Sequence, residues 1–312
     1  MPGICEGRVV IITGGGRGLG RAHALEFARQ GARVLVNDIG AELDGTGSSS
    51  GPAGDVVEQI RAMGGDAIAN GDDISDFEGS RHVVEAAIQR WGTLDVVVNN
   101  AGILRDRMIF NMSVEDFDAV IRVHLRGTWC MCHHAAVYWR EKSRDGGAVD
   151  ARIINTSSPA GLYTSVGQTN YGPAKAGIAN MTIILAGELG RYGVTVNAIS
   201  PGARTRMTET IRRPGAISAT PADGFDAGDP ANVSPLVVWL ASAEAKDVTG
   251  RVFNVRGGSI SIAEPWHAGA ESDKHARWEA GELGPVIRDL VGRARPRVGP
   301  FGQVQPAVAE VR

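Results

Sequence analysis

The sequence predicts an α/β fold, a doubly wound, seven-stranded parallel sheet with helices on both faces. Two observations carry this prediction. Short runs of β-branched residues alternate with longer helical patterns, and several of these runs are almost continuously apolar. A strand that helices cover on both faces has no solvent side and needs such a run. With 312 residues, the chain is long enough for one large domain of this class.

Seven runs are predicted to be strands, in chain order: residues 8–13, 33–38, 66–70, 94–100, 151–158, 194–200 and 251–255. Three stretches break the alternation with helices. Residues 38–54 are rich in Gly and Ser and predict a flexible surface loop, and residues of about 203–230 form a variable substrate segment. Strand patterning stops after residue 258. We therefore expect one domain over residues 1–258 and a C-terminal extension over 259–312, disordered from about Arg293.

Composition excludes several classes of function. The 32 basic and 35 acidic residues leave a formal charge of −3, so no strong field attracts nucleic acid or a membrane surface. No apolar stretch is long enough to span a bilayer, and the first residues lack a signal-peptide pattern. The three cysteines do not have the spacing of a disulfide framework. These features predict a soluble, cytoplasmic protein with a small-molecule substrate.

One group of soft side chains invites a metal hypothesis: Cys130, Cys132, His133 and His134. On a helix only Cys130 and His134, four residues apart, share a face well, and two ligands do not make a zinc site. We expect no metal, and we expect the cysteines to pack as small apolar groups.

A glycine turn follows the first predicted strand. Residues 13–20 read TGGGRGLG and lead into a helical pattern. Gly14 permits a tight turn, Gly18 lets the backbone approach a pyrophosphate, and Gly20 allows close helix packing, while the helix N-terminus offers N–H groups to phosphate. The alternative is a merely flexible turn. Asp38 argues against it, because it ends the second strand about twenty residues later, where a carboxylate can bind ribose hydroxyls. These residues therefore predict a Rossmann-type dinucleotide-binding site.

The cofactor expected at this site is NAD. Asp38 would repel the 2′-phosphate of NADP, but Arg17 could pair with that phosphate, so NADP stays possible. Otherwise Arg17 is a solvated turn residue. Asp73, after the third strand, could bind the adenine or be an ordinary exposed acid. The remaining contacts expected here are Leu19, Asn100, Ala101 and Gly102.

Three side chains are predicted to perform proton transfer: Ser158, Tyr171 and Lys175. Tyr171 and Lys175 are four residues apart and share a helix face, so the ammonium could lower the phenol pKa from its usual value of about 10. Ser158 follows a strand and could hold the substrate oxygen. Singly, each residue could be a packing residue, a surface charge or a helix cap. Together they predict an oxidoreductase with Tyr171 as acid and base.

In these motifs the chain resembles the short-chain dehydrogenase/reductase family over about residues 7–258. It has the family's TGxxxGxG at 13–20, NNAG at 99–102 and YxxxK at 171–175. Ser158 stands between the last two motifs, where the family has its serine. The resemblance implies that Lys175 binds the nicotinamide ribose and lowers the tyrosine pKa, and that Ser158 orients the carbonyl. It also implies a homodimer or homotetramer, and places three further residues at the nicotinamide: Pro201, Gly202 and Thr205.

One position departs from the family pattern. Most members have an asparagine in a VNLxG-like segment, where it supports a water-linked proton relay, but this chain has His124 in VHLRG. His124 either replaces the asparagine or is a satisfied histidine between helices. The stretches VNDIG, NNAGILRDRM and VHLRGT resemble the (3R)-hydroxyacyl-CoA dehydrogenase part of the peroxisomal multifunctional β-oxidation enzyme.

The expected reaction is hydride transfer between NAD(H) and a secondary alcohol or ketone, most simply a 3-hydroxyacyl or 3-oxoacyl thioester. The rivals are an NADPH-dependent 3-oxoacyl-[acyl-carrier-protein] reductase, a steroid or terpenoid alcohol dehydrogenase and a non-catalytic cofactor-binding scaffold. Arg204 and Arg206 could meet an acidic group of substrate or cofactor, or be solvated loop charges.

Overall fold

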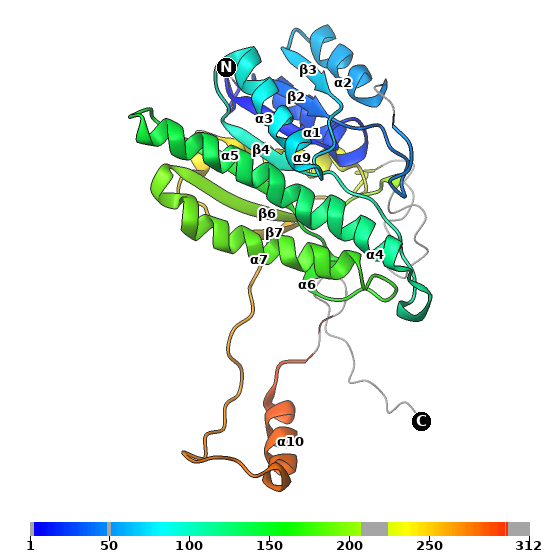
Figure 1. Ribbon diagram of the computed structural model, residues 1–312, viewed down its shortest axis with the longest axis vertical. Helices are drawn as coiled ribbons and strands as arrows, with labels where there is room; N and C mark the ends of the chain where they lie inside the picture. The colour runs from blue at the N-terminus through cyan, green and yellow to red at the C-terminus, as the bar shows by residue number, and fades with distance from the viewer. Residues whose placement is uncertain (1–2, 49–50, 207–223, 297, 299–312) are drawn as a thin grey trace. The chain divides into compact units, whose positions relative to one another are not determined.

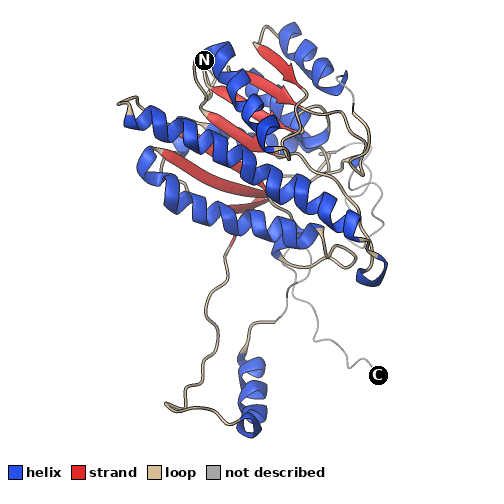
Figure 2. Ribbon diagram, in the orientation of Figure 1, coloured by secondary structure: helices blue, strands red, loops and turns tan. Residues whose placement is uncertain are grey.

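A computed structural model describes residues 3–48, 51–206, 224–296 and 298. The chain divides into two compact units, Met1–Ala263 and Glu264–Arg312. In the first unit, one sheet lies between two layers of helices (Figures 1 and 2). This arrangement confirms the predicted doubly wound α/β class.

The strands of the sheet lie in the order β3-β2-β1-β4-β5-β6-β7-β8. The strands β1 to β7 are all parallel to one another, and the edge strand β8 is antiparallel to β7. The strand order reverses between β1 and β4, and a ligand binds at the carboxyl ends of strands at such a point. The bounds are β1 Val9–Thr13, β2 Arg33–Asn37, β3 Ala67–Asn70, β4 Val96–Asn99, β5 Ala151–Thr156, β6 Val194–Gly202, β7 Val252–Arg256 and β8 Ser259–Ala263.

Strand β8 differs from the prediction, because no strand was expected after residue 258. Arg256 pairs with Ser259, so the two glycines between them form a tight hairpin turn. Gly257 has a φ of 52°, a conformation that glycine adopts without strain. The prediction was wrong here because the run SISIA is short, and its alternation alone is a weak strand signal. A second correction concerns the predicted loop at 38–54, since a helix begins at Gly51.

The helices cover the two faces of the sheet. One face carries α1 (Gly18–Arg29), α2 (Gly51–Ala62) and α9 (Ser234–Ala241) in one apolar cluster. The other face carries α3 (Phe77–Trp91), α5 (Gly127–Arg144) and α7 (Tyr171–Leu189). α4 (Val114–Ile121) runs into α5 through a π-helical turn, Arg122–Arg126, and α6 (Pro159–Leu162) is a single turn. The continuously apolar strands are thus buried from both sides.

The second unit contains one longer helix, α10 (Leu283–Arg293), after a 3₁₀ turn at Ala280–Glu282. Disorder was expected from about Arg293, but most of those residues lie outside the described ones. Most of the variable segment at 203–230 also lies outside them. No helix in the described part of the chain has the length and apolar composition needed to cross a bilayer.

Candidate active site

The glycine turn joins β1 to α1 as predicted. Gly14 and Gly18 have φ angles of 62° and 51°, in the left-handed region that favours glycine. A Cβ on Gly20 would lie 2.0 Å from the carbonyl oxygen of Gly14, so only glycine fits there. No side chain caps the N-terminus of α1 at Arg17. Its first N–H groups are therefore available to an anion, as a dinucleotide pyrophosphate requires.

Asp38 lies directly against this turn. Its Oδ2 accepts a hydrogen bond of 2.8 Å from the Gly16 N–H, and its Oδ1 accepts one of 2.7 Å from the Gly40 N–H. Arg17 does not extend freely into solvent, because its Nη1 donates to the Ala41 carbonyl at 3.1 Å. The carboxylate is thus fixed beside the glycine turn, in the place expected of a group that binds the adenosine ribose.

The end of β4 supports the turn from the other side. Asn100 Nδ2 donates to the carbonyl oxygens of Thr13 and Gly14, each at 3.1 Å. The N–H groups of Asn100 and Ala101 both donate to Thr13 Oγ1. These bonds hold the shape of the turn, so the residues after β4 have a structural role in addition to the contact predicted with the cofactor.

Other predicted cofactor contacts are distributed around the turn. Thr205 lies next to it, since a Cβ on Gly18 would lie 3.5 Å from Thr205 Cγ2, and Pro201 and Gly202 end β6. Leu19 packs against the apolar core. Asp73 accepts hydrogen bonds from Ser75 and lies 3.5 Å from Arg122. Its carboxylate is therefore engaged within the protein, a contact that neither interpretation of Asp73 included.

The three residues predicted for proton transfer meet at the carboxyl end of β5. Tyr171 begins α7, and Lys175 lies one turn later with its Nζ 5.6 Å from the centre of the Tyr171 ring. Lys175 Nζ also donates to the Thr156 carbonyl at 2.6 Å. Ser158 Oγ accepts from the Ala160 N–H at 3.2 Å, which caps α6. Ser158 also acts to lower the pKa of Tyr171, so it is both a helix cap and a neighbour of the phenol.

Burial controls the protonation of this cluster. It raises the pKa of Tyr171 to about 12, although the nearby Ser158 hydroxyl acts in the opposite direction, and the charge of Asp106 raises it further. Burial also lowers the pKa of Lys175 to about 7. The expected lowering of the tyrosine pKa by Lys175 is not found, because both groups are removed from water and each then favours its neutral form.

His124 lies beside the tyrosine and lysine, within the π-helical turn. Its ring meets the Tyr171 ring edge-on, with centroids 5.0 Å apart. Its Nε2 lies 2.8 Å from the Ile103 oxygen and 3.1 Å from the Ile103 nitrogen, and its buried Nδ1 has no hydrogen-bond partner among the described residues. Burial, helped by the charge of Lys175, holds the His124 pKa well below its usual range. The imidazole is therefore neutral.

Gly102 provides the space for this imidazole. A Cβ at position 102 would lie 2.2 Å from His124 Cε1. The glycine predicted as a cofactor contact therefore has a structural role, which depends on the histidine at position 124.

Three polar residues near the tyrosine were not predicted individually. Gln168 Nε2 donates to Asp106 Oδ2 at 2.6 Å. Asn170 caps α7, because its Oδ1 accepts from the Tyr171 N–H at 2.7 Å. An asparagine directly before a helical pattern is a recognised cap signal and could have identified Asn170. Nothing in the sequence pairs Asp106 with Gln168, which are far apart in the chain.

The remaining candidates make contacts of their own. Arg204 forms a two-pronged ion pair with Asp226, and Arg206 lies 3.6 Å from Glu42. Arg204 is therefore held by a partly buried carboxylate, whereas Arg206 forms an ion pair that is exposed to solvent. Cys130 and Cys132 are buried free thiols. Within the described ranges, no group of three or more His, Cys, Asp or Glu side chains is placed to hold a metal ion.

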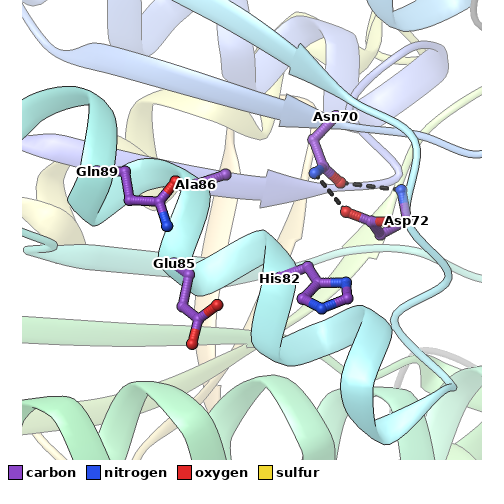
Figure 3. Close-up of a pocket in the computed structure, with 6 residues that line it drawn as sticks. All are labelled: Asn70, Asp72, His82, Glu85, Ala86 and Gln89. Atoms are coloured by element: carbon purple, nitrogen blue, oxygen red, sulfur yellow. Dashed lines mark hydrogen bonds between the residues drawn. The ribbon is translucent and has the colours of Figure 1, made fainter.

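A polar surface hollow lies elsewhere, between the end of β3 and α3 (Figure 3). Asn70 and Asp72 hydrogen-bond to each other at its edge. None of the residues predicted for cofactor or catalysis lines it; its lining residues are Asn70, Asp72, His82, Glu85, Ala86 and Gln89.

Comparison with known proteins decides the family. The sequence model for short chain dehydrogenases matches residues 8–215. The chain belongs to the short chain dehydrogenase family. It is therefore an oxidoreductase that acts on CH–OH groups, as the glycine turn and the Ser158, Tyr171 and Lys175 cluster predicted.

Relatives within the short chain dehydrogenase family carry more specific names. The chain is 46% identical over 298 residues to the hydroxyacyl-CoA dehydrogenase ChsB1 of Mycobacterium tuberculosis, covering 93% of this chain and 90% of that protein. It is 40% identical to the peroxisomal multifunctional enzyme type 2 of Mus musculus, over 91% of this chain but 34% of the longer enzyme. The resemblance predicted from sequence is confirmed.

Solved structures of short chain dehydrogenases are also similar to this chain. A short chain dehydrogenase from Mycobacterium avium has a TM-score of 0.86 and 56% identity, covering 96% of this chain and all of that one. A short chain dehydrogenase from Mycobacterium paratuberculosis, whose structure is bound to NAD, has a TM-score of 0.70 and 29% identity over 82% of this chain and 98% of that one.

Proposed function

We propose that the protein is an NAD-dependent dehydrogenase of 3-hydroxyacyl thioesters, able to run in the reverse direction on 3-oxoacyl thioesters. The observation that carries this proposal is the meeting of Ser158, Tyr171 and Lys175 at the carboxyl end of β5. The thioester as substrate is supported by the 46% identity to a protein named as a hydroxyacyl-CoA dehydrogenase.

In the proposed reaction, Tyr171 takes the proton of the substrate hydroxyl. Ser158 holds the same oxygen, so that the charge developing on it is stabilised as the C–H bond breaks. NAD, when bound, accepts the hydride and brings a positive charge to the site. Because burial raises the pKa of Tyr171 to about 12, the phenol holds its proton strongly in the free enzyme. Tyr171 can therefore take the substrate proton only after its own proton has left, and the fraction of Lys175 that is protonated near neutral pH favours that phenolate.

His124 and Lys175 are proposed to supply and remove this proton. Lys175 has a pKa lowered to about 7, so it can exchange a proton near neutral pH. The neutral His124 keeps an unpartnered Nδ1 in the same buried region. Its Nε2 lies between the Ile103 N–H and C=O, so either tautomer has a partner there. This supports a role for His124 in place of the family's asparagine.

The choice of NAD rests on Asp38. Its carboxylate is held against the glycine turn by the Gly16 and Gly40 N–H groups, and a 2′-phosphate brought there would meet a like charge. Arg17 is hydrogen-bonded to the loop after β2 through the Ala41 carbonyl, which weakens its case as a phosphate partner. The solved relative bound to NAD is consistent with this preference.

The test is an absorbance assay for reduced nicotinamide, with 3-hydroxyacyl-CoA substrates of both configurations and with NAD and NADP separately. We expect turnover with NAD, and a loss of about a thousandfold in kcat for Tyr171→Phe, because the general acid-base group is removed. Tyr192→Phe is the matched control, since that tyrosine lies on a separate 3₁₀ turn at Gly190–Tyr192.

Two results would contradict the proposal. Full activity in Tyr171→Phe would remove the mechanism. Turnover with NADPH and acyl-carrier-protein thioesters alone would replace the proposed dehydrogenase with a reductase of fatty-acid synthesis.

We also propose, from the family resemblance and composition, that the enzyme is a cytoplasmic homodimer or homotetramer. Light scattering would measure the oligomeric state.

A further inference from the structure

Four large apolar side chains are exposed next to one another beside the active site. Met108, Ile109 and Phe110 follow β4, and Val166 lies in the loop before α7; their exposed fractions range from 44% to 76%. We call them the apolar platform. The two segments are joined by a hydrogen bond of 2.9 Å from the Arg107 N–H to the Gly167 carbonyl. Figure 1 shows both at the same corner of the first unit. Grouped apolar exposure of this kind marks a binding surface.

The platform is tied to the catalytic helix. Asn170 Nδ2 donates to the Arg105 carbonyl at 2.9 Å, while Asn170 Oδ1 accepts from the Tyr171 N–H. Gln168 binds Asp106, whose charge acts on the tyrosine pKa. The backbone that carries the platform is therefore fixed relative to the first residue of α7, and a substrate at Tyr171 has the platform as a neighbouring surface.

A cation completes this surface. Arg107 is exposed, and its Nη1 donates to the Asp106 carbonyl at 2.8 Å. In the part of the chain that the structure describes, no carboxylate lies within ion-pair distance of it. An unpaired guanidinium beside apolar side chains suits a ligand that is both apolar and anionic.

We propose that the apolar platform and Arg107 bind the carrier arm of coenzyme A, a proposal that rests on the function proposed above. The pantetheine chain has a pair of methyl groups and the adenine ring is flat, so both can cover Ile109, Phe110 and Val166. The phosphates give Arg107 its partner. The acyl part of the substrate enters the protein at Tyr171, and the carrier arm must leave towards solvent, where this open surface lies.

The first test compares two substrates with the same acyl group, one on coenzyme A and one on N-acetylcysteamine, which lacks the arm. We expect Phe110→Ser to lower kcat/KM about tenfold for the coenzyme A thioester only, because apolar contact with the arm is lost. Met63→Ser is the matched control, since Met63 is an exposed apolar residue at the end of α2.

Arg107→Gln should lower kcat/KM for the coenzyme A thioester about threefold at low salt, with the difference vanishing at high salt. Arg33→Gln, an exposed arginine that begins β2, is its control. Equal losses on both substrates would overturn the proposal. A change in oligomeric state in Phe110→Ser, measured by light scattering, would assign the platform to a second copy instead.

A calorimetric titration with free coenzyme A separates this proposal from the proposed reaction. Binding of coenzyme A by the wild type that weakens in both Phe110→Ser and Arg107→Gln supports the carrier site even where no thioester is oxidised. Turnover of the N-acetylcysteamine thioester without any binding of coenzyme A would leave the proposed function intact and overturn the carrier site.

Discussion

The two halves of the active site are built differently. On the side proposed for the cofactor, the glycine turn beside Asp38 forms a site from backbone: positive φ angles, N–H groups and positions where a Cβ has no room. On the catalytic side, the half-buried Tyr171 and the buried Lys175 and His124 form a site from side chains whose pKa values burial has shifted. The first half depends on space, and the second depends on the exclusion of water.

The largest effect that this difference predicts comes from one methyl group at the turn. Gly20→Ala places a Cβ 2.0 Å from the Gly14 carbonyl oxygen, so the backbone must move. We expect the free energy of unfolding to fall by about 3 kcal/mol and NAD binding to be lost. Urea denaturation and a fluorescence titration with NAD measure the two effects.

Gly54→Ala is the control for that variant. Gly54 lies in α2, and nothing lies within 4 Å of the position its Cβ would take. Alanine there should stabilise the protein by about 0.5–1 kcal/mol through its higher helix propensity. Unchanged NAD affinity in Gly20→Ala would refute the view that space at the turn decides cofactor binding.

A smaller effect is expected on the catalytic side, where chemistry matters more than volume. His124→Leu leaves the Ile103 N–H and C=O unpaired, and we expect kcat/KM to fall about thirtyfold. His124→Asn can donate and accept at the same place, so it should keep most of the activity. Steady-state kinetics over a range of pH compares the two variants.

The pH profile makes the test of His124 specific. If His124 takes part in proton transfer, the pH at half-maximal kcat should move in both variants, by more in His124→Leu. A uniform loss at every pH would reduce the histidine to a packing residue. Circular dichroism confirms that both variants are folded.

A separate effect concerns stability and its dependence on pH. His23 in α1 is buried, its Nδ1 pairs with Ser234 Oγ at 2.9 Å, and burial lowers its pKa to about 3. Below the usual histidine pKa of 6.5, the unfolded chain binds a proton that the folded chain does not. Stability is therefore lost as the pH falls from about 6.5 towards 3, by about 1.4 kcal/mol per pH unit for this group.

His23→Gln should make the stability curve less steep in that range, measured by urea denaturation at several pH values. His267→Gln, which changes an exposed histidine, should leave the slope as it is. Equal slopes in all three proteins would show that folding does not lower the pKa of His23.

Much of this molecule could be predicted from the sequence. The seven β-branched runs predicted seven strands, and the nearly continuous apolar character of several of them predicted a parallel sheet, because a strand covered on both faces must be apolar throughout. The glycine turn, Asp38 and the tyrosine-lysine spacing were found because they are local: each depends on a few neighbouring residues or on one helical turn. β8 was missed because five residues of weak alternation become a strand only when β7 is there to pair with them.

What the sequence by itself determined is the family and the chemistry, and it also predicted where the cofactor binds. Only the tertiary structure decided how the catalytic groups are charged, because burial is a property of the packed chain: it raised the Tyr171 pKa where the Lys175 spacing alone predicted a fall. It also decided which distant residues meet, such as Gly102 with His124 and Arg107 with Gly167. Those contacts join segments that lie apart in the chain, so the spacing of residues in the sequence does not predict them.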